Sequence, residues 1–163
     1  MPPGSTPDPT LKNKPFTQRQ WLVILAATVV AAVLRMLYLG EWSLWIDEAH
    51  TWRDATMPLE GEGGFMNEQR RLYPLPFFLL RFLFGIGVLG FDEWSLRLPF
   101  ALIGLVTVPV LAICGRRLVG RWPAVFAACL LAVHPWHIFW SQNARGYGMV
   151  VLGSILFLHR VHV

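Results

Sequence analysis

The chain has 163 residues and a net charge of +4; 55% of its residues are apolar and only 15% are charged. Soluble domains average about 45–50% apolar and about 25% charged residues, so this composition argues against a soluble protein and for a membrane protein. The positive charge does not indicate nucleic-acid binding, because the basic residues are scattered between apolar stretches and form no recognition motif.

The N-terminal part predicts a tail followed by a membrane span. Residues 1–18 are rich in proline and cannot bury a core, so we expect a disordered tail on the cytoplasmic side. The apolar run over 21–39 approaches the roughly 20 residues that a transmembrane helix needs. A cleaved signal peptide is the alternative, but its apolar core would hold only about 7–15 residues. We therefore predict a retained helix, in which Arg35 extends to the nearby interface.

Two different segments follow this first span. Residues 40–72 contain most of the acidic residues of the chain, which predicts an extramembrane loop, with a short surface helix over 43–57. Residues 74–90 are apolar with Arg81 at their centre. This segment could either cross the membrane or lie in the interface as an amphipathic helix.

Two further apolar runs, about 98–115 and 122–140, predict membrane spans. They are separated by a short loop that carries Arg116, Arg117 and Arg121. The positive-inside rule assigns such a loop to the cytoplasmic side, as it does the basic N-terminal tail.

These two assignments decide between the alternatives for residues 74–90. If this segment crossed the membrane, the arginine loop would lie outside, whereas an interfacial helix leaves the loop inside. The interfacial arrangement also places every acidic residue except Asp8 on the outer side. We therefore predict an interfacial helix over 74–90.

The last apolar run, 147–158, is too short to cross a membrane comfortably. We expect the chain to end within an element and to be a truncated part of a longer protein; a complete small protein with a shallow last helix is the alternative.

Several polar residues at the outer side could carry chemistry. Asp47 and Glu48 follow the first span, between tryptophans that suit a membrane interface, so they belong either to a solvated loop or to a general base at the membrane surface. Arg71 precedes Tyr73 and two prolines, so it either extends to the interface at the start of a helix or binds a lipid phosphate. Arg145, on a short turn two residues before Tyr147, either anchors the turn at the interface or binds a phosphate, which a guanidinium does well.

Neither cysteine nor histidine spacing predicts a metal site. Cys114 and Cys129 lie inside apolar runs, where a thiol behaves as a small apolar group. His134 and His137 are separated by Pro135 and have no acidic neighbour.

The order of these pieces resembles the N-terminal region of the GT-C membrane glycosyltransferases. The motifs are SLWIDEA after the first span, YPLPFF, EWSLRLP, GRRLVGR, and HPWHIFWSQNARGYG. The resemblance covers about residues 21–158. It is strongest to bacterial mannosyl- and galacturonosyltransferases related to protein O-mannosyltransferases and to the aminoarabinose transferase of lipid A.

The resemblance implies an activity and a set of site residues. Members take a sugar from a polyprenyl-phosphate donor at the outer face of the cytoplasmic membrane and pass it to a hydroxyl of a lipid, glycan or protein. Asp47 matches their acidic residue in the first outer loop, the catalytic base, and Glu48 matches its neighbour. Arg145 and Tyr147 match their Arg-x-Tyr turn.

Two departures accompany the match. Many relatives have a histidine before two adjacent prolines, whereas here Tyr73 stands at that position and Leu75 separates Pro74 from Pro76. Relatives are also several times longer, so we expect this chain to be inactive by itself.

These observations predict an all-α integral membrane protein that binds substrate through Glu48, Arg71, Tyr73, Arg97, Arg145 and Tyr147 around the base Asp47. Arg71 and Arg97 are the reserve cations for the leaving phosphate, behind Arg145. No metal ligand and no cofactor is assigned, and dependence on a divalent metal stays open. The alternative function is a non-catalytic membrane protein, such as a transporter subunit or an assembly partner, but a transporter would more often hold ionisable groups at mid-membrane.

Overall fold

A computed structural model of the protein describes residues 14–60 and 74–162. Within these ranges every regular element is a helix, which confirms the predicted all-α class. The helices are α1 (Gln18–Met36), α2 (Ile46–Thr56), α3 (Pro74–Gly85), α4 (Glu93–Val119), α5 (Arg121–Val133), α6 (Pro135–Ser141) and α7 (Tyr147–His162). Among the described residues, α1 and α4 are each long and apolar enough to cross a membrane.

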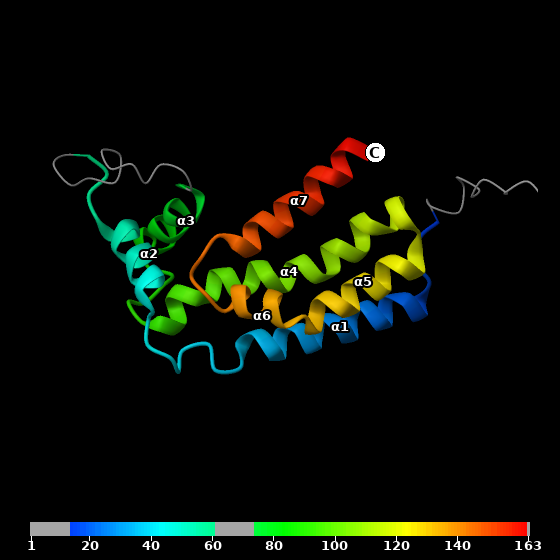
Figure 1. Ribbon diagram of the computed structural model, residues 1–163, viewed down its shortest axis with the longest axis horizontal. Coiled ribbons are helices and arrows are strands. Elements are labelled where there is room, and N and C mark those ends of the chain that lie inside the picture. The colour runs from blue at the N-terminus through cyan, green and yellow to red at the C-terminus, as the bar shows by residue number, and fades with distance from the viewer. Residues whose placement is uncertain (1–13, 61–73, 163) are drawn as a thin grey trace, which may run out of the picture.

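The long helices form a bundle with the short ones gathered at one end. Helices α1, α4 and α5 contact one another, and α7 packs on α4 (Figure 1). Helices α2 and α3 contact each other and lie beyond the end of α1 (Figure 1). The chain therefore passes along the bundle in α1, returns in α4, and reaches the α2–α3 end again through α5 and α6.

Small side chains allow the bundle helices to approach closely. The core between α1, α4 and α5 includes Ala27, Ala31, Ala112, Ala128 and Ala132, all buried. In a membrane, helix association depends on close packing rather than on the hydrophobic effect, and small residues make that packing possible. The remaining faces of these helices carry large exposed apolar side chains, as a lipid-facing surface requires.

The beginning of α1 differs from the predicted disordered tail. Thr17 and Gln20 form a capping box, which satisfies free N–H groups at the start of the helix. Phe16, before the cap, is buried, and its ring lies 5.3 Å from that of Trp21. An aromatic side chain next to a cap can bury itself against the bundle although the residues before it are proline-rich. Residues 1–13 lie outside the described part of the chain.

Helix α4 is longer at both ends than the predicted span over 98–115. Its N-terminus is set by Asp92, whose carboxylate accepts a hydrogen bond from the backbone N–H of Ser95 at 2.9 Å. Its C-terminus is set by Gly120, whose φ of 91° is a conformation that other residues rarely adopt. Pro109 lies inside the helix without ending it.

The predicted span over 122–140 is a broken helix. Helix α5 ends at Val133, α6 begins at Pro135, and their axes differ by 61°. Proline has no N–H and its ring clashes with the preceding turn, which explains the break at this position.

Helix α3 is held against α2 by its own arginine. Arg81 Nη1 donates to the carbonyl oxygens of Ala55 at 3.3 Å and Met57 at 2.7 Å, which belong to the C-terminal end of α2. These carbonyls lack intrahelical donors, and a cation suits that end of a helix. Helix α3 ends at Gly85, earlier than the predicted residue 90, and the chain then turns through Gly87 with a φ of 71°.

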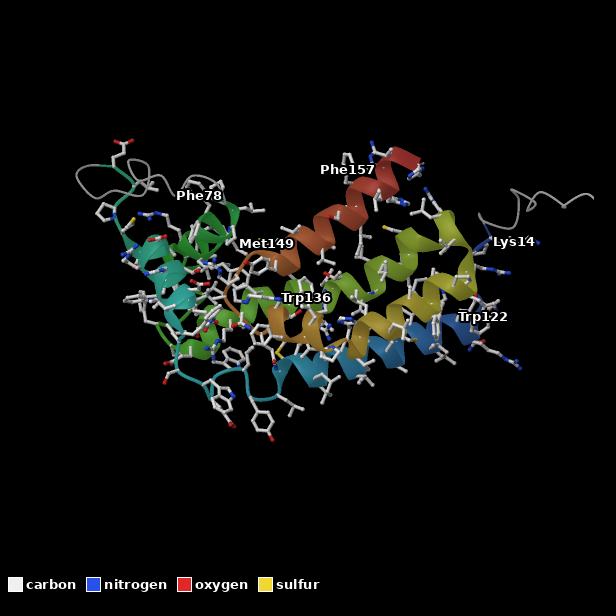
Figure 2. The ribbon with its side chains drawn as sticks, viewed as in Figure 1. Lys14, Phe78, Trp122, Trp136, Met149 and Phe157 are labelled. Carbon is white, nitrogen blue, oxygen red and sulfur yellow. The ribbon has the colours of Figure 1, made fainter. Side chains whose placement is uncertain are left out.

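The opposite end of the bundle is basic. Arg121 Nη1 donates to the Pro15 carbonyl at 3.2 Å, and the Arg116 guanidinium lies 5.2 Å from the centre of the Phe16 ring. Lys14 and Trp122 lie at this end, away from Phe78 of α3 (Figure 2). The arginine loop and the N-terminal segment thus meet in space, while the described acidic residues occur in and around α2 and at the start of α4.

Candidate active site

Helix α2 separates its two acidic residues by environment. Asp47 and Glu48 occupy its first turn, where the helix dipole stabilises negative charge. Successive residues of a helix point about 100° apart, so one faces the surface and the other the interior. The Asp47 side chain is 39% exposed, whereas that of Glu48 is completely buried.

Glu48 and Arg97 form a buried ion pair. The Glu48 carboxylate accepts from Arg97 Nε at 2.9 Å and Nη2 at 2.6 Å, and from the backbone N–H of Ala144 at 2.9 Å. Arg97 Nη1 also donates to the carbonyl oxygens of Leu39 at 3.0 Å and Trp42 at 2.9 Å. One pair therefore joins α2, α4, the segment after α1 and the turn between α6 and α7.

That turn brings Arg145 to Asp47. Because the N–H of Ala144 is bound to Glu48, the next residue is directed toward the exposed side of α2. Arg145 Nη2 lies 3.7 Å from Asp47 Oδ2, with side chains 29% and 39% exposed. The contact joins a general-base candidate to a phosphate-binding candidate from the other end of the sequence.

A cavity of about 450 Å³ opens beside this pair. Its walls come from Thr51 of α2, the first turn of α3 at Pro74–Phe77, the turn residues Arg145 and Gly146, and the first residues of α7, Tyr147, Met149 and Val150. Figure 2 shows Met149 at the α7 wall, where α7 begins near α3. Most of these side chains are apolar, so the cavity suits a ligand with a hydrocarbon part and a charged group at Arg145.

Aromatic side chains continue from the cavity along the surface. The rings of Tyr147 and Trp140 have centroids 4.1 Å apart, and Trp45, at the N-cap of α2, lies 6.4 Å from Trp140. Trp45 and Tyr147 are both exposed. Aromatic rings with one polar edge are typical of a membrane–water interface.

The structure divides the predicted site residues into groups. Arg145 and Tyr147 line the cavity, and Asp47 contacts Arg145. Glu48 and Arg97 also come together, but their buried hydrogen bonds to the protein leave them as the support beneath the site. The remaining two, Arg71 and Tyr73, lie outside the described residues.

The structure contains a second buried arginine, which the sequence did not predict. Arg35 was expected to extend to the interface, and this was wrong: its side chain is fully buried and bonded to α5 and α6. His137, without an assigned role, is one of its partners at 2.7 Å. The position of Arg35 within an apolar helix could have indicated its burial. A charge in a membrane has a high free-energy cost, so such residues usually face the protein interior.

No three His, Cys, Asp or Glu side chains come together as metal ligands within residues 14–60 and 74–162. Cys114 and Cys129 are both free thiols.

The family model described as dolichyl-phosphate-mannose-protein mannosyltransferase matches residues 73–162. The chain belongs to this family. The match confirms the resemblance to GT-C membrane glycosyltransferases and, with the apolar helices, identifies a multi-pass membrane protein. Comparison with curated proteins and with solved structures gave no match.

The family match covers part of the candidate site. It includes the first turn of α3, Arg97, Arg145 and Tyr147, and it begins after Asp47 and Glu48. The base candidate is therefore connected to the matched region by geometry, through its contact with Arg145.

Proposed function

We propose that the protein belongs to the machinery that moves a sugar from a polyprenyl-phosphate donor to a hydroxyl acceptor at the outer face of the cytoplasmic membrane. The observation that carries the proposal is the contact of Asp47 with Arg145, which itself lines an apolar cavity. A carboxylate, a guanidinium and an apolar cavity suit, respectively, the acceptor hydroxyl, the phosphate and the prenyl chain of such a reaction.

The chemistry assigns a role to each partner. The acceptor oxygen forms a bond to the anomeric carbon as the bond from that carbon to the phosphate oxygen breaks. The hydroxyl proton moves to Asp47, which acts as general base. The polyprenyl phosphate leaves with additional negative charge, which Arg145 stabilises.

The resting contact between the two side chains suits this sequence of events. Arg145 Nη2 and Asp47 Oδ2 are 3.7 Å apart, longer than a well-formed hydrogen bond. An incoming phosphate competes for the guanidinium, and its binding frees the Asp47 carboxylate to accept a proton. Arg145 thus pairs with the Asp47 carboxylate in the empty site and binds the donor phosphate in the occupied site.

The two ends of the bundle support an outer location of the site. The arginine loop and the N-terminal segment meet at one end, which the positive-inside rule assigns to the cytoplasm. The cavity lies at the other end with α2 and α3. Within the described part of the chain helix α3 covers 12 residues and packs on α2 at that end, in agreement with an interfacial location.

Transfer of a radiolabelled sugar tests the proposal. Membranes contain the chain, either alone or together with the C-terminal spans of a longer member of the family, and receive polyprenyl-phosphate mannose as donor. We expect turnover in the preparation with the added spans. There, Asp47→Asn should lower kcat by about 10²–10⁴-fold, the usual contribution of a general base.

The matched control is Glu41→Gln, which removes an exposed carboxylate from the same end of the molecule. We expect it to retain activity. Arg145→Lys keeps the charge but loses the forked geometry, and should raise KM for the donor and lower kcat. Equal activity of Asp47→Asn and Glu41→Gln would exclude Asp47 as the base. If no preparation transfers the sugar, the result would instead favour a non-catalytic membrane protein.

A further inference from the structure

The break between α5 and α6 leaves backbone acceptors without their usual donors. In an unbroken helix the carbonyl of Leu131 would accept from the N–H of residue 135, but proline has none, and this carbonyl accepts instead from the His134 N–H at a long 3.4 Å. The 61° bend also ends the regular pattern for the Ala132 carbonyl. Inside a membrane such groups must find other partners, because no water is available.

Arg35 of α1 supplies these partners. Its Nη1 donates to the carbonyl oxygen of Ala132 at 3.0 Å and its Nη2 to that of Leu131 at 3.3 Å. The same Nη2 lies 2.7 Å from His137 Nδ1 on α6, beyond the break. Because a guanidinium only donates, Nδ1 accepts, so one side chain holds both sides of the bend.

A second contact runs in the opposite direction. Gln142, which follows α6, donates from Nε2 to the carbonyl oxygens of Leu34 at 3.0 Å and Leu37 at 2.8 Å. These carbonyls lie at the C-terminal end of α1, where backbone carbonyls lack intrahelical donors. The end of α1 therefore caps the end of α5 through Arg35, and the residue after α6 caps α1.

The packing of α6 against α4 restricts this arrangement further. Ser141, the last residue of α6, is buried against Gly104 of α4, where a Cβ atom would clash with the serine side chain. The end of α6 is thereby fixed next to α4, directly before the turn that carries Arg145.

We propose that Arg35 is a positioning residue: it holds the α5–α6 bend and so delivers the turn with Arg145 to α2 and α3. Arg35 is not among the residues that line the cavity. Its effect on sugar transfer rests on the proposed function, whereas its effect on the position of the turn can be measured without any turnover.

A disulfide between the turn and α3 reports that position. A Cβ atom at Gly146 would lie 2.8 Å from Cγ of Pro76, so cysteines at the two positions meet the Cβ separation of a disulfide after a small adjustment. The double variant Pro76→Cys with Gly146→Cys is made in a chain whose Cys114 and Cys129 are replaced by alanine. We expect it to cross-link readily when the turn is correctly placed.

Arg35→Met should lower the rate of cross-linking several-fold while the helical circular dichroism signal is kept. Arg117→Met, which removes an exposed arginine from the opposite end of the bundle, is the matched control and should cross-link at the parental rate. Arg35→Lys keeps the buried charge but cannot reach all the carbonyls, and we expect an intermediate rate. If Arg35→Met does not fold, the cross-linking rate of Arg35→Lys tests the proposal.

Adding Pro135→Ala to Arg35→Met separates positioning from stabilisation. Alanine restores the N–H for the Leu131 carbonyl, so thermal stability should recover, but the straighter helix should leave the cross-linking rate low. The proposal is supported if thermal stability recovers while the cross-linking rate stays low. An unchanged cross-linking rate in the folded Arg35 variants, or its full return with Pro135→Ala, would overturn it.

Discussion

Replacing Glu48 by glutamine tests whether one buried ion pair holds the candidate site together. The side chain keeps its shape but loses its charge, and Arg97 keeps its own. Both carboxylate oxygens accept in the native protein: Oε1 from Arg97 Nε and from the Ala144 N–H, and Oε2 from Arg97 Nη2. A glutamine amide must place an NH₂ group against at least one of these donors.

The expected loss follows from burial. Glu48 is fully buried and the Arg97 side chain is 6% exposed, so water cannot replace the lost partner. Removing one member of a buried pair typically costs about 3–5 kcal/mol of unfolding free energy, because the other charge stays uncompensated. Arg97→Met should cost at least as much, since the carbonyls of Leu39 and Trp42 also lose their donor. The double variant should lose less than the sum of the single variants.

Reversible unfolding in mixed detergent micelles measures this loss. The control is Arg53→Gln: its ion-pair partner Asp54 is only 5% exposed, but Arg53 itself is 46% exposed and is little desolvated, so we expect a smaller loss than at Glu48. Limited proteolysis of the folded variants shows whether the segment after α1 and the Arg145 turn have loosened together. A Glu48→Gln loss no greater than that of Arg53→Gln would refute the structural role assigned to the pair.

Two further predictions concern α4. Asp92→Ala should lower stability by about 1 kcal/mol through loss of the N-cap, with thermal melts in detergent as the measurement. Hydrogen bonds from the Ser95 backbone and hydroxyl hold the pKa of Asp92 below its usual value, so its contribution is present above the unfolded pKa. The difference between the two proteins should therefore shrink as the pH falls through the folded pKa; a pH-independent difference would contradict this. Gly104→Ala should cost about 1–3 kcal/mol, because its Cβ would clash with Ser141, and unchanged stability would show that α4 and α6 are farther apart.

The sequence by itself determined the class of the protein. Apolar runs of membrane-spanning length, separated by charged segments, predict helices regardless of how these pack, because a membrane requires internal backbone hydrogen bonds. The order of the motifs around Asp47, Arg97 and Arg145 indicated the family that the match over 73–162 shows. The limits of the helices were predicted less accurately from the sequence, because α4 extends beyond its apolar run to the caps at Asp92 and Gly120.

Only the tertiary structure decided which charged residues are exposed at the candidate site and which are buried beneath it. Asp47 and Glu48 are neighbours in the sequence, yet the turn of the helix exposes one and buries the other. Arg35 resembled an interfacial anchor, because the sequence does not reveal that Pro135, far along the chain, leaves carbonyls in need of a donor. Hydrogen bonds between distant segments depend on how the helices cross, and that geometry is set by the packing of the whole bundle.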